Sequence, residues 1–260
     1  MTLKLDHVVV AVHDLDAAIA DYTDLGFQVQ VGGAHPGRST HNALVVFEDG
    51  SYFELIAWRA PAPQERWWQL LQRDGEGIVD FALLPADTAR TVAQAAAAGL
   101  VLDGPTPGGR VRPDGQELRW ETARPGTADL PFLCGDRTPR ALRVPGGAAA
   151  QHDNGATGIA SLAVAVHDVD LTLARYRALL GTAATGSAAH LPDGRGHLAT
   201  VHLSGSTLVL CAPPTAAGVV REGPYAVVLS TAGGVPPPAI DAAQAHGARI
   251  ELAARATQAA

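Results

Sequence analysis

The sequence contains few cysteines, few aromatic residues and no surplus of positive charge. Two of its 260 residues are cysteines and 5% are aromatic, while the formal net charge is −7. Cys134 and Cys211 lie far apart and form no Cys-x-x-Cys pair, which argues against a disulfide framework and a thiolate-rich zinc motif. The acidic balance argues against general nucleic-acid binding, which requires a basic face.

Long apolar runs and leader features are also absent. No run approaches the roughly 20 apolar residues that a membrane-spanning helix needs. The first ten residues, MTLKLDHVVV, lack the features of a signal peptide. The signatures GxSxG, GxGxxG and the P-loop are missing as well. We therefore expect a cytoplasmic protein with buried thiols that binds neither membranes nor nucleic acid.

Residues 5–60 predict a βαβββ unit. The segment LDHVVVAV at 5–12 is rich in β-branched residues, as expected of a buried strand. Asp14 is a suitable N-cap for a helix over 15–25, and Gly26 is a suitable stop. The extended segments FQVQV, NALVVFE and SYFELIA follow, and the polar segment GGAHPGRSTH between the first two predicts a loop.

The same order of elements recurs along the chain. Residues 77–136 predict a second βαβββ unit, in which Asp87 caps the helix and Gly99 ends it. The Pro-, Gly- and Ala-rich residues 140–157 predict a linker. A third unit follows, because Val12-His13-Asp14 recurs as Val166-His167-Asp168, and a fourth, with a helix over PPAIDAAQAHG, stops after ARIELAA. Such internal repetition is a strong indicator of fold.

Two polar residues lie inside apolar strands of the first unit. Strand alternation puts His7 and Val9 on one face and Asp6 and Val8 on the other. Glu54 lies within YFELIA, where an ionised carboxylate is costly unless it is paired or bound to a metal. Each residue could be structural and bonded to a neighbour. Two such costly residues within one unit indicate a metal-binding or catalytic pair.

The paired βαβββ units resemble the vicinal oxygen chelate superfamily, which includes glyoxalase I, methylmalonyl-CoA epimerase, extradiol dioxygenases and bleomycin-resistance proteins. The segments LDHVVVAVHDLDAA, GGAHPGRSTHNALVVF, DGSYFELIA, RPDGQELRW and LPFL resemble its glyoxalase-like domain group in particular. The resemblance implies an α+β fold in which tandem βαβββ modules, at 5–60 and 77–136, pair into open half-barrel sheets. A glyoxalase-like domain would span 1–139, a linker 140–157 and a second half 158–260, with a degenerate third module and a truncated fourth.

The resemblance also implies where a metal ion would bind, because the superfamily draws its ligands from the first and last strands of paired units. Carried over, the ligands are His7, Glu54 and Asp80, with His41 as a further candidate. An imidazole and carboxylates suit Fe(II), Mn, Co, Ni or Zn. Asp80 could instead pair with an arginine, and His41 could be structural. Near Leu133 and Cys134, the last strand of the second unit offers no carboxylate or amide, so a full set of four ligands is not visible, and the site could be empty.

Residues near the hairpin RPDG are candidates for substrate binding. Arg110, Arg112 and Arg119 cluster there and could clamp a carboxylate or phosphate, although a solvated, charged hairpin is the simpler alternative. Trp120 and, from the Gly-rich loop, His35 could line the cleft. We take Arg112, Arg119, Trp120 and His35 as the predicted substrate-binding set.

Three functions are consistent with this sequence. The first is a metal-dependent lyase, isomerase or dioxygenase that acts on a small oxygen-rich molecule, with Glu54 or Asp80 moving a proton. The second is a non-catalytic protein that binds or sequesters a small molecule, as resistance proteins of the superfamily do. The third is a structural or partner-binding protein. A homodimer could form through the unpaired strand edge of the fourth unit.

Overall fold

The protein is described from a computed structural model, which covers residues 3–192, 196–212, 221–232 and 239–254. It is a mixed α+β structure with many strands and few helices, as the sequence predicted. The helices are α1 (Leu15–Asp24), α2 (Arg66–Asp74), α3 (Thr88–Ala97), α4 (Arg140–Arg143) and α5 (Val169–Leu180), with 3-10 turns η1 (Gly147–Ala150) and η2 (Thr182–Ala184). None of the helices in these ranges is long and apolar enough to cross a membrane.

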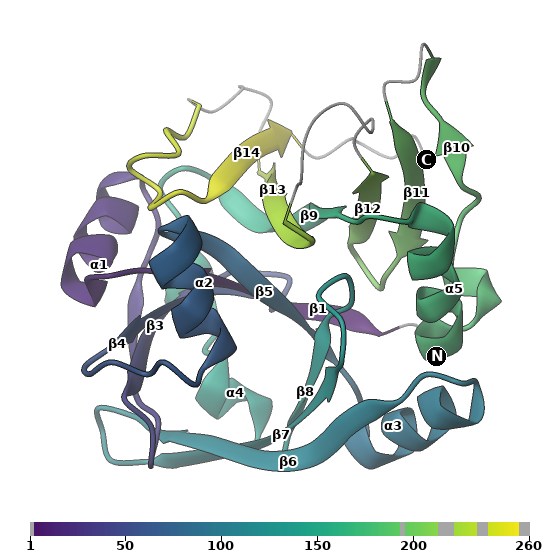
Figure 1. Ribbon diagram of the computed structural model, residues 1–260. Coiled ribbons are helices and arrows are strands. Elements are labelled where there is room, and N and C mark those ends of the chain that lie inside the picture. The colour runs from purple at the N-terminus through teal and green to yellow at the C-terminus, as the bar shows by residue number, and fades with distance from the viewer. Residues whose placement is uncertain (1–2, 193–195, 213–220, 233–238, 255–260) are drawn as a thin grey trace.

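The first eight strands form a closed barrel (Figure 1). They are β1 (Lys4–Ala11), β2 (Gln30–Ala34), β3 (Thr40–Val46), β4 (Tyr52–Trp58), β5 (Gly77–Leu84), β6 (Leu102–Val111), β7 (Glu117–Pro125) and β8 (Phe132–Asp136). Their order around the barrel is β1, β4, β3, β2, β6, β7, β8, β5. The two sequence units thus supply four consecutive strands each.

Closure of the barrel corrects the expectation of open half-barrel sheets. The two units meet along β1 and β5, which pair antiparallel over most of their length. They meet again between β2 and β6, where a single pair, Ala34 with Val111, completes the ring. Strand β2 begins and ends three residues later than the predicted strand FQVQV, so the sheet extends as far as Ala34, the residue that pairs with β6.

The predicted helix caps are confirmed in atomic detail. The carboxylate of Asp14 accepts hydrogen bonds from the backbone N–H groups of Asp16 and Ala17 at the start of α1. Asp87 and Asp168 cap α3 and α5 in the same way, through Arg90 and Leu171 respectively. Each cap satisfies backbone donors that the first helical turn leaves unpaired. The recurring Val-His-Asp motif therefore marks a strand-to-helix junction in both halves of the chain.

The second half forms an open sheet of six strands above the barrel in Figure 1. Its order is β10, β11, β12, β9, β13, β14, with bounds Ala156–Ala165 (β9), Ala189–His190 (β10), His197–His202 (β11), Thr207–Ala212 (β12), Gly223–Thr231 (β13) and Arg249–Ala254 (β14). Strands β9 to β12 repeat the pairing of β1 to β4. Strand β13 pairs with β9 and β14 as β5 pairs with β1 and β8. The described residues supply no counterpart of β6 and β7.

The segment ARIELAA therefore takes the place of a last strand in its unit. The helix predicted over PPAIDAAQAHG lies partly outside the described residues, and its described part forms turns instead. This corrects the predicted helix.

Residues 140–157, predicted as a linker, pack against the barrel. They contain α4 and η1, and the side chains of Arg143 and His152 are buried. His152 accepts a hydrogen bond from the backbone N–H of Gln28, and its other ring nitrogen contacts the carbonyl of Val46 at 3.0 Å. This segment separates the barrel from the second sheet in sequence, and it also packs against strands of the barrel.

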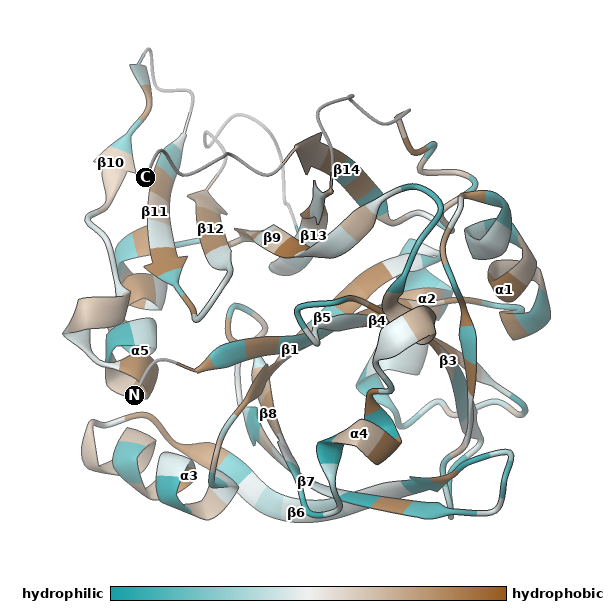
Figure 2. Ribbon diagram, turned by 180° about the vertical axis from the view of Figure 1, so that it is seen from behind, coloured by the Kyte–Doolittle hydropathy of each residue, from teal (hydrophilic) through white to brown (hydrophobic). Residues whose placement is uncertain are grey.

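One apolar core runs through both halves. It contains Leu5 and Phe53 of the barrel together with Leu162 and Leu229 of the second sheet, all fully or almost fully buried. Helices α3 and α5, one from each half, pack against each other (Figure 1). Helix α1 carries both brown and teal turns in Figure 2, as a helix with one buried face should.

Candidate functional site

A β-bulge in the first strand brings Asp6 and His7 together. The register between β1 and β5 shifts between Leu5 and His7, so that Asp6 is left without a cross-strand partner. A bulge of this kind re-aims side chains, and here the Asp6 carboxylate lies 2.7 Å from His7 Nδ1. Strict alternation, which predicted opposite faces for these two residues, fails at this point. Because Nδ1 is engaged by Asp6, Nε2 is the ring nitrogen directed toward Glu54.

Glu54 on β4 completes the pair predicted from the sequence. Its Oε2 lies 3.5 Å from His7 Nε2, and both side chains are buried. Asn42 on β3 donates a 2.7 Å hydrogen bond to Oε1, and His35 Nε2 lies 3.8 Å from the same oxygen. Burial alone would raise the pKa of Glu54, but His7, His35 and the Asn42 hydrogen bond hold it below its ordinary value. The carboxyl is therefore ionised at neutral pH.

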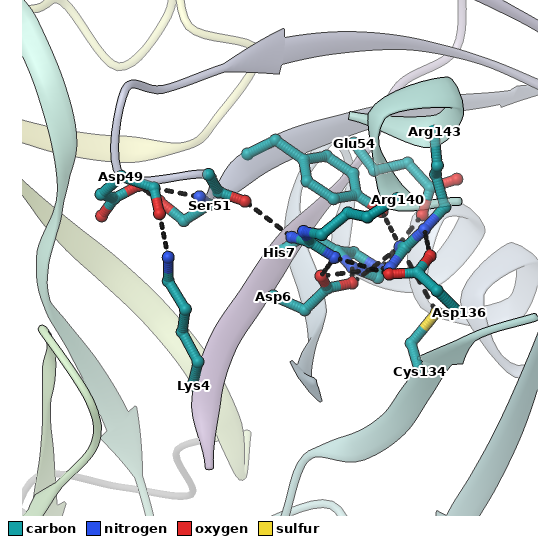
Figure 3. Close-up of polar contacts among 12 residues, drawn as sticks. Lys4, Asp6, His7, Asp49, Ser51, Glu54, Cys134, Asp136, Arg140 and Arg143 are labelled. Carbon is teal, nitrogen blue, oxygen red and sulfur yellow. Dashed lines mark hydrogen bonds and ion pairs between the residues drawn. The ribbon is translucent and has the colours of Figure 1, made fainter. Parts of the chain in front are cut away.

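Helix α4 supplies the cations that balance Asp6 (Figure 3). Arg143 Nη1 lies 2.8 Å from Asp6, and Arg140 Nη1 lies 2.7 Å from it. Asp136 on β8 binds both arginines as well. Burial opposes ionisation of Asp6, yet Arg143, His7 and Arg140 keep its pKa well below its ordinary value. The carboxylate behind His7 is therefore ionised at neutral pH.

Asn42 and Arg110 continue this network around the barrel wall. Arg110 donates to the side-chain oxygen of Asn42 at 3.3 Å and to the backbone carbonyl of Arg143 at 3.2 Å. Arg110 therefore links the residues around Glu54 to helix α4, which also carries the arginines that bind Asp6. Gly32 on β2 makes this approach feasible, because a Cβ there would overlap the side chains of both Asn42 and Arg110.

The site residues surround a cavity of ≈ 170 Å³ inside the barrel. Its walls combine polar groups with aromatic rings. They include His7, His35, Asn42, Tyr52, Glu54, Trp67, Arg110, Trp120, Arg124, Phe132, Cys134 and Arg143. A largely enclosed cavity with a few converging polar groups is the usual form of a small-molecule site.

Two of the predicted substrate-binding residues line this cavity. His35 hydrogen-bonds to Thr40 Oγ1 at 2.9 Å and packs its ring edge-to-face with that of Trp120, with a centroid separation of 6.0 Å. Burial lowers the pKa of His35, so the ring is neutral at pH 7. His35, Trp120, His7 and Glu54 are thus brought together as the sequence suggested.

Asp80 lies beside a neighbouring cavity and has other partners. Its Oδ2 accepts hydrogen bonds from Arg66 at 2.7 Å and from the Trp67 indole at 2.8 Å. Its Oδ1 accepts from the backbone N–H of Phe81. Of the two alternatives considered for Asp80, an arginine partner is the one present in this structure.

His41, Arg112 and Arg119 do not line the barrel cavity. His41 alternates with Asn42 on β3 and lies on the outer side, within electrostatic reach of Arg59, Asp14 and Asp16. Arg112 bonds to the carbonyl of Leu142 and pairs with Asp114.

Arg119 is exposed and pairs with Glu117 on its own strand. Of the hairpin arginines, it is Arg110 whose side chain reaches the cavity. For Arg112 and Arg119 the structure shows the charged, solvated hairpin considered as the alternative.

A second group of potential metal ligands consists of Asp6, His7 and Cys134, whose ligand atoms lie within 4.8 Å of one another. Two arginines already bind Asp6. Burial raises the pKa of the Cys134 thiol to about 12, although Arg143 opposes the rise. A protonated thiol and a carboxylate already paired with cations are poor ligands, so the pair His7 and Glu54 is the better candidate.

Asn42, Tyr52 and Arg143 are site residues that the sequence analysis did not identify. Asn42 could have been found, because alternation in NALVVFE places it on the face of β3 that adjoins Glu54 of β4. Arg143 gave no such signal, since it lies in a segment whose composition predicts a linker. Its place in the site depends on a tertiary contact with Asp6, 137 positions earlier in the chain.

The barrel of paired βαβββ units, with polar side chains from its first and fourth strands facing the interior, defines the vicinal oxygen chelate architecture. A family model described as "Glyoxalase-like domain" matches residues 5–180, from the barrel through α4 to α5. The chain therefore belongs to the glyoxalase-like domain family. No curated protein matches the chain.

Solved structures share the fold at low sequence identity. A hypothetical protein from Staphylococcus aureus matches with a TM-score of 0.73 and 15% identity, covering 96% of this chain and 100% of its own. A mutant of 4-hydroxymandelate synthase from Streptomyces coelicolor matches with a TM-score of 0.58 and 16% identity, covering 88% of this chain and 71% of its own. At this level of identity, these likenesses concern the fold alone.

Proposed function

We propose that the barrel cavity is the active site of a metal-dependent enzyme acting on a small, oxygen-rich molecule by lyase, isomerase or dioxygenase chemistry. The observation that carries this proposal is the spacing of His7 Nε2 and Glu54 Oε2, which lie 3.5 Å apart. Two atoms that bind one ion at about 2.1 Å are separated by roughly 3.0–3.4 Å. The pair thus fits a shared divalent ion with only a small adjustment.

The surroundings of the pair support this role. Asp6 on the Nδ1 side of His7 is the carboxylate that metal-binding histidines commonly have behind them, because it fixes the tautomer and the ring orientation. Asn42 fixes the rotamer of Glu54. His7 and Glu54 supply two protein ligands, and an imidazole with a carboxylate suits Fe, Mn, Co, Ni or Zn.

Bound at this pair, a divalent ion would supply Lewis acidity toward an oxygen of the substrate. The protein's own groups account for the remaining chemistry. Neutral His35, 3.8 Å from Glu54, can accept a proton at Nε2 from a substrate carbon or hydroxyl held in the cavity. Trp67, Trp120 and Phe132 exclude water and present apolar surface to the substrate. Asp80 stays a secondary candidate as a ligand, whereas His41, on the outer side of β3, is left out of the proposed ligand set.

Metal analysis of protein purified without chelator tests this proposal. We expect about one transition-metal ion per chain, and its loss in His7→Ala and in Glu54→Ala. His41→Ala is the matched control, because it removes an imidazole from the outer side of β3 and should leave the metal content unchanged. Equal metal content in wild type and His7→Ala would contradict the proposal, as would failure of all five metals to bind.

A binding protein without catalysis is the second candidate, and the aromatic lining of the cavity favours it. Trp67, Trp120 and Phe132 would stack on a planar apolar ligand. Thermal-shift measurements separate the two functions. Stabilisation by apolar ligands but not by divalent ions supports sequestration, whereas chelator-sensitive turnover of any small substrate supports the enzyme.

A further inference from the structure

A second cavity adjoins the barrel cavity and shares part of its wall. It measures ≈ 530 Å³ and lies beside α2 and the segment 124–130. Four side chains line both cavities, namely Arg38, Trp67, Arg124 and Phe132. The larger cavity, called the vestibule below, thus borders the cavity of His7 and Glu54 along these four residues.

The vestibule carries more positive than negative charge. Its lining includes the guanidinium groups of Arg38, Arg66 and Arg124 but only two carboxylates, those of Glu65 and Asp80. Glu65 accepts a hydrogen bond from the Trp58 indole. The Asp80 oxygen that faces Arg66 is already shared with the Trp67 indole.

Arg124 and Arg38 are the cations with the weakest protein partners. Arg124 lies 3.5 Å from the same crowded Asp80 oxygen, at the limit of a hydrogen bond. Arg38 is exposed and has no ion-pair partner within the described part of the chain. Burial has the largest effect on the pKa of Arg124, and it lowers that pKa. Repulsion from Arg38 and Arg66 lowers it further, although Asp80 opposes the change. An anion placed between Arg38 and Arg124 would relieve this repulsion.

Packing presents Arg124 to the vestibule in a fixed orientation. Its guanidinium group lies over the rings of Trp67 and Phe132, at 4.9 and 4.3 Å from their centroids. A guanidinium group that covers aromatic faces keeps the N–H donors at its own edge free, where they can bind a carboxylate or phosphate with two bonds. The loop that carries Arg38 also carries His35, so one loop contributes to both cavities.

The geometry points to a substrate with an anionic group, a carboxylate or a phosphate, which Arg38 and Arg124 hold in the vestibule while its reactive part lies between His7 and Glu54. This inference deepens the proposed function and rests on it for the location of the reaction. The anion-binding step itself involves no metal ion. Its test is therefore independent of the metal content of the protein.

Calorimetric titration of EDTA-treated protein with three matched probes tests the inference. Benzoate and phenyl phosphate carry the two candidate anions on one apolar ring, and benzyl alcohol is their neutral counterpart. We expect at least one anion to bind about tenfold or more tightly than the alcohol. Tighter binding of benzoate assigns a carboxylate, and tighter binding of phenyl phosphate assigns a phosphate.

Two variants and a control attribute the affinity to residues. Arg38→Gln and Arg124→Gln should each weaken anion binding about tenfold or more. Arg90→Gln removes an equal charge from an exposed position on α3 and should leave the affinity for the anions unchanged. Arg38 is exposed, so its variant folds even if Arg124→Gln does not. Equal binding of alcohol and anions, or wild-type anion affinity in Arg38→Gln, would overturn the inference. Absence of metal would overturn only the proposed metal site.

Discussion

At the scale of single residues, the site depends on a carboxylate that does not itself face the cavity. Asp6 binds His7 on one side and two arginines of α4 on the other. Carboxylates of this kind raise the basicity of the imidazole and fix the nitrogen that binds metal. Asp6 is therefore a positioning residue, and its effect should appear in metal affinity.

Asp6→Asn should weaken metal binding by about 10–100-fold, because the neutral amide no longer fixes the tautomer of His7. Competition against a chelating dye measures the dissociation constant. Asp136→Asn is the matched control, since it removes a carboxylate from the same two arginines without touching His7. Both variants should lose stability, but only Asp6→Asn should lose metal affinity. An equal loss of metal affinity in both variants would contradict the positioning role of Asp6 and leave it a structural role only.

Residues such as His7 and Glu54 can be predicted from sequence, because each interrupts an apolar strand where a polar group is costly. Asp6 could not be placed correctly, since strand alternation does not foresee a bulge whose position depends on pairing with β5. Asp80 looked equivalent to His7 by alignment. Its partner Arg66 lies on α2, outside both predicted units, so this ion pair could not be predicted from the pattern of the units.

At the scale of elements, sequence patterns predicted most strands and the helix caps, because these depend on residues close together in the chain. They did not predict closure of the barrel, which rests on the pairing of β1 with β5 and of β2 with β6. They also did not predict α4 and η1 within residues 140–157. Glycine and alanine are frequent there, but α4 is short and gains its stability from ion pairs that Arg140 and Arg143 make with distant strands.

At the scale of the whole molecule, the two halves share one core and specific polar contacts. Tyr22 of α1 donates a hydrogen bond to the carbonyl of Ala245, and Tyr176 of α5 donates one to the carbonyl of Asp129. Arg175 of α5 lies 2.7 Å from the buried carboxylate of Asp129. The second half is thus attached to the walls of the barrel that carries the site.

These contacts predict that both halves unfold in one transition. All four tryptophans, Trp58, Trp67, Trp68 and Trp120, lie in the barrel half, so their fluorescence reports on that half, whereas far-UV circular dichroism reports on both. We expect coincident midpoints in urea. Arg175→Met should lower both midpoints by an amount equivalent to about 1–3 kcal/mol, because Asp129 loses a partner. The control variant Arg177→Met, at an exposed position on the same helix, should leave both midpoints unchanged. A separate transition seen by dichroism alone would show independent domains.

The most direct test of the central claim is anomalous diffraction from crystals grown with Mn²⁺ or Co²⁺. The account predicts a single strong peak within bonding distance, about 2.0–2.2 Å, of His7 Nε2 and Glu54 Oε2. Asp6 should stay hydrogen-bonded to Nδ1 on the far side of the ring. A peak at Asp6 and Cys134 instead, or no peak at an ion concentration that saturates the protein in solution, would contradict the account.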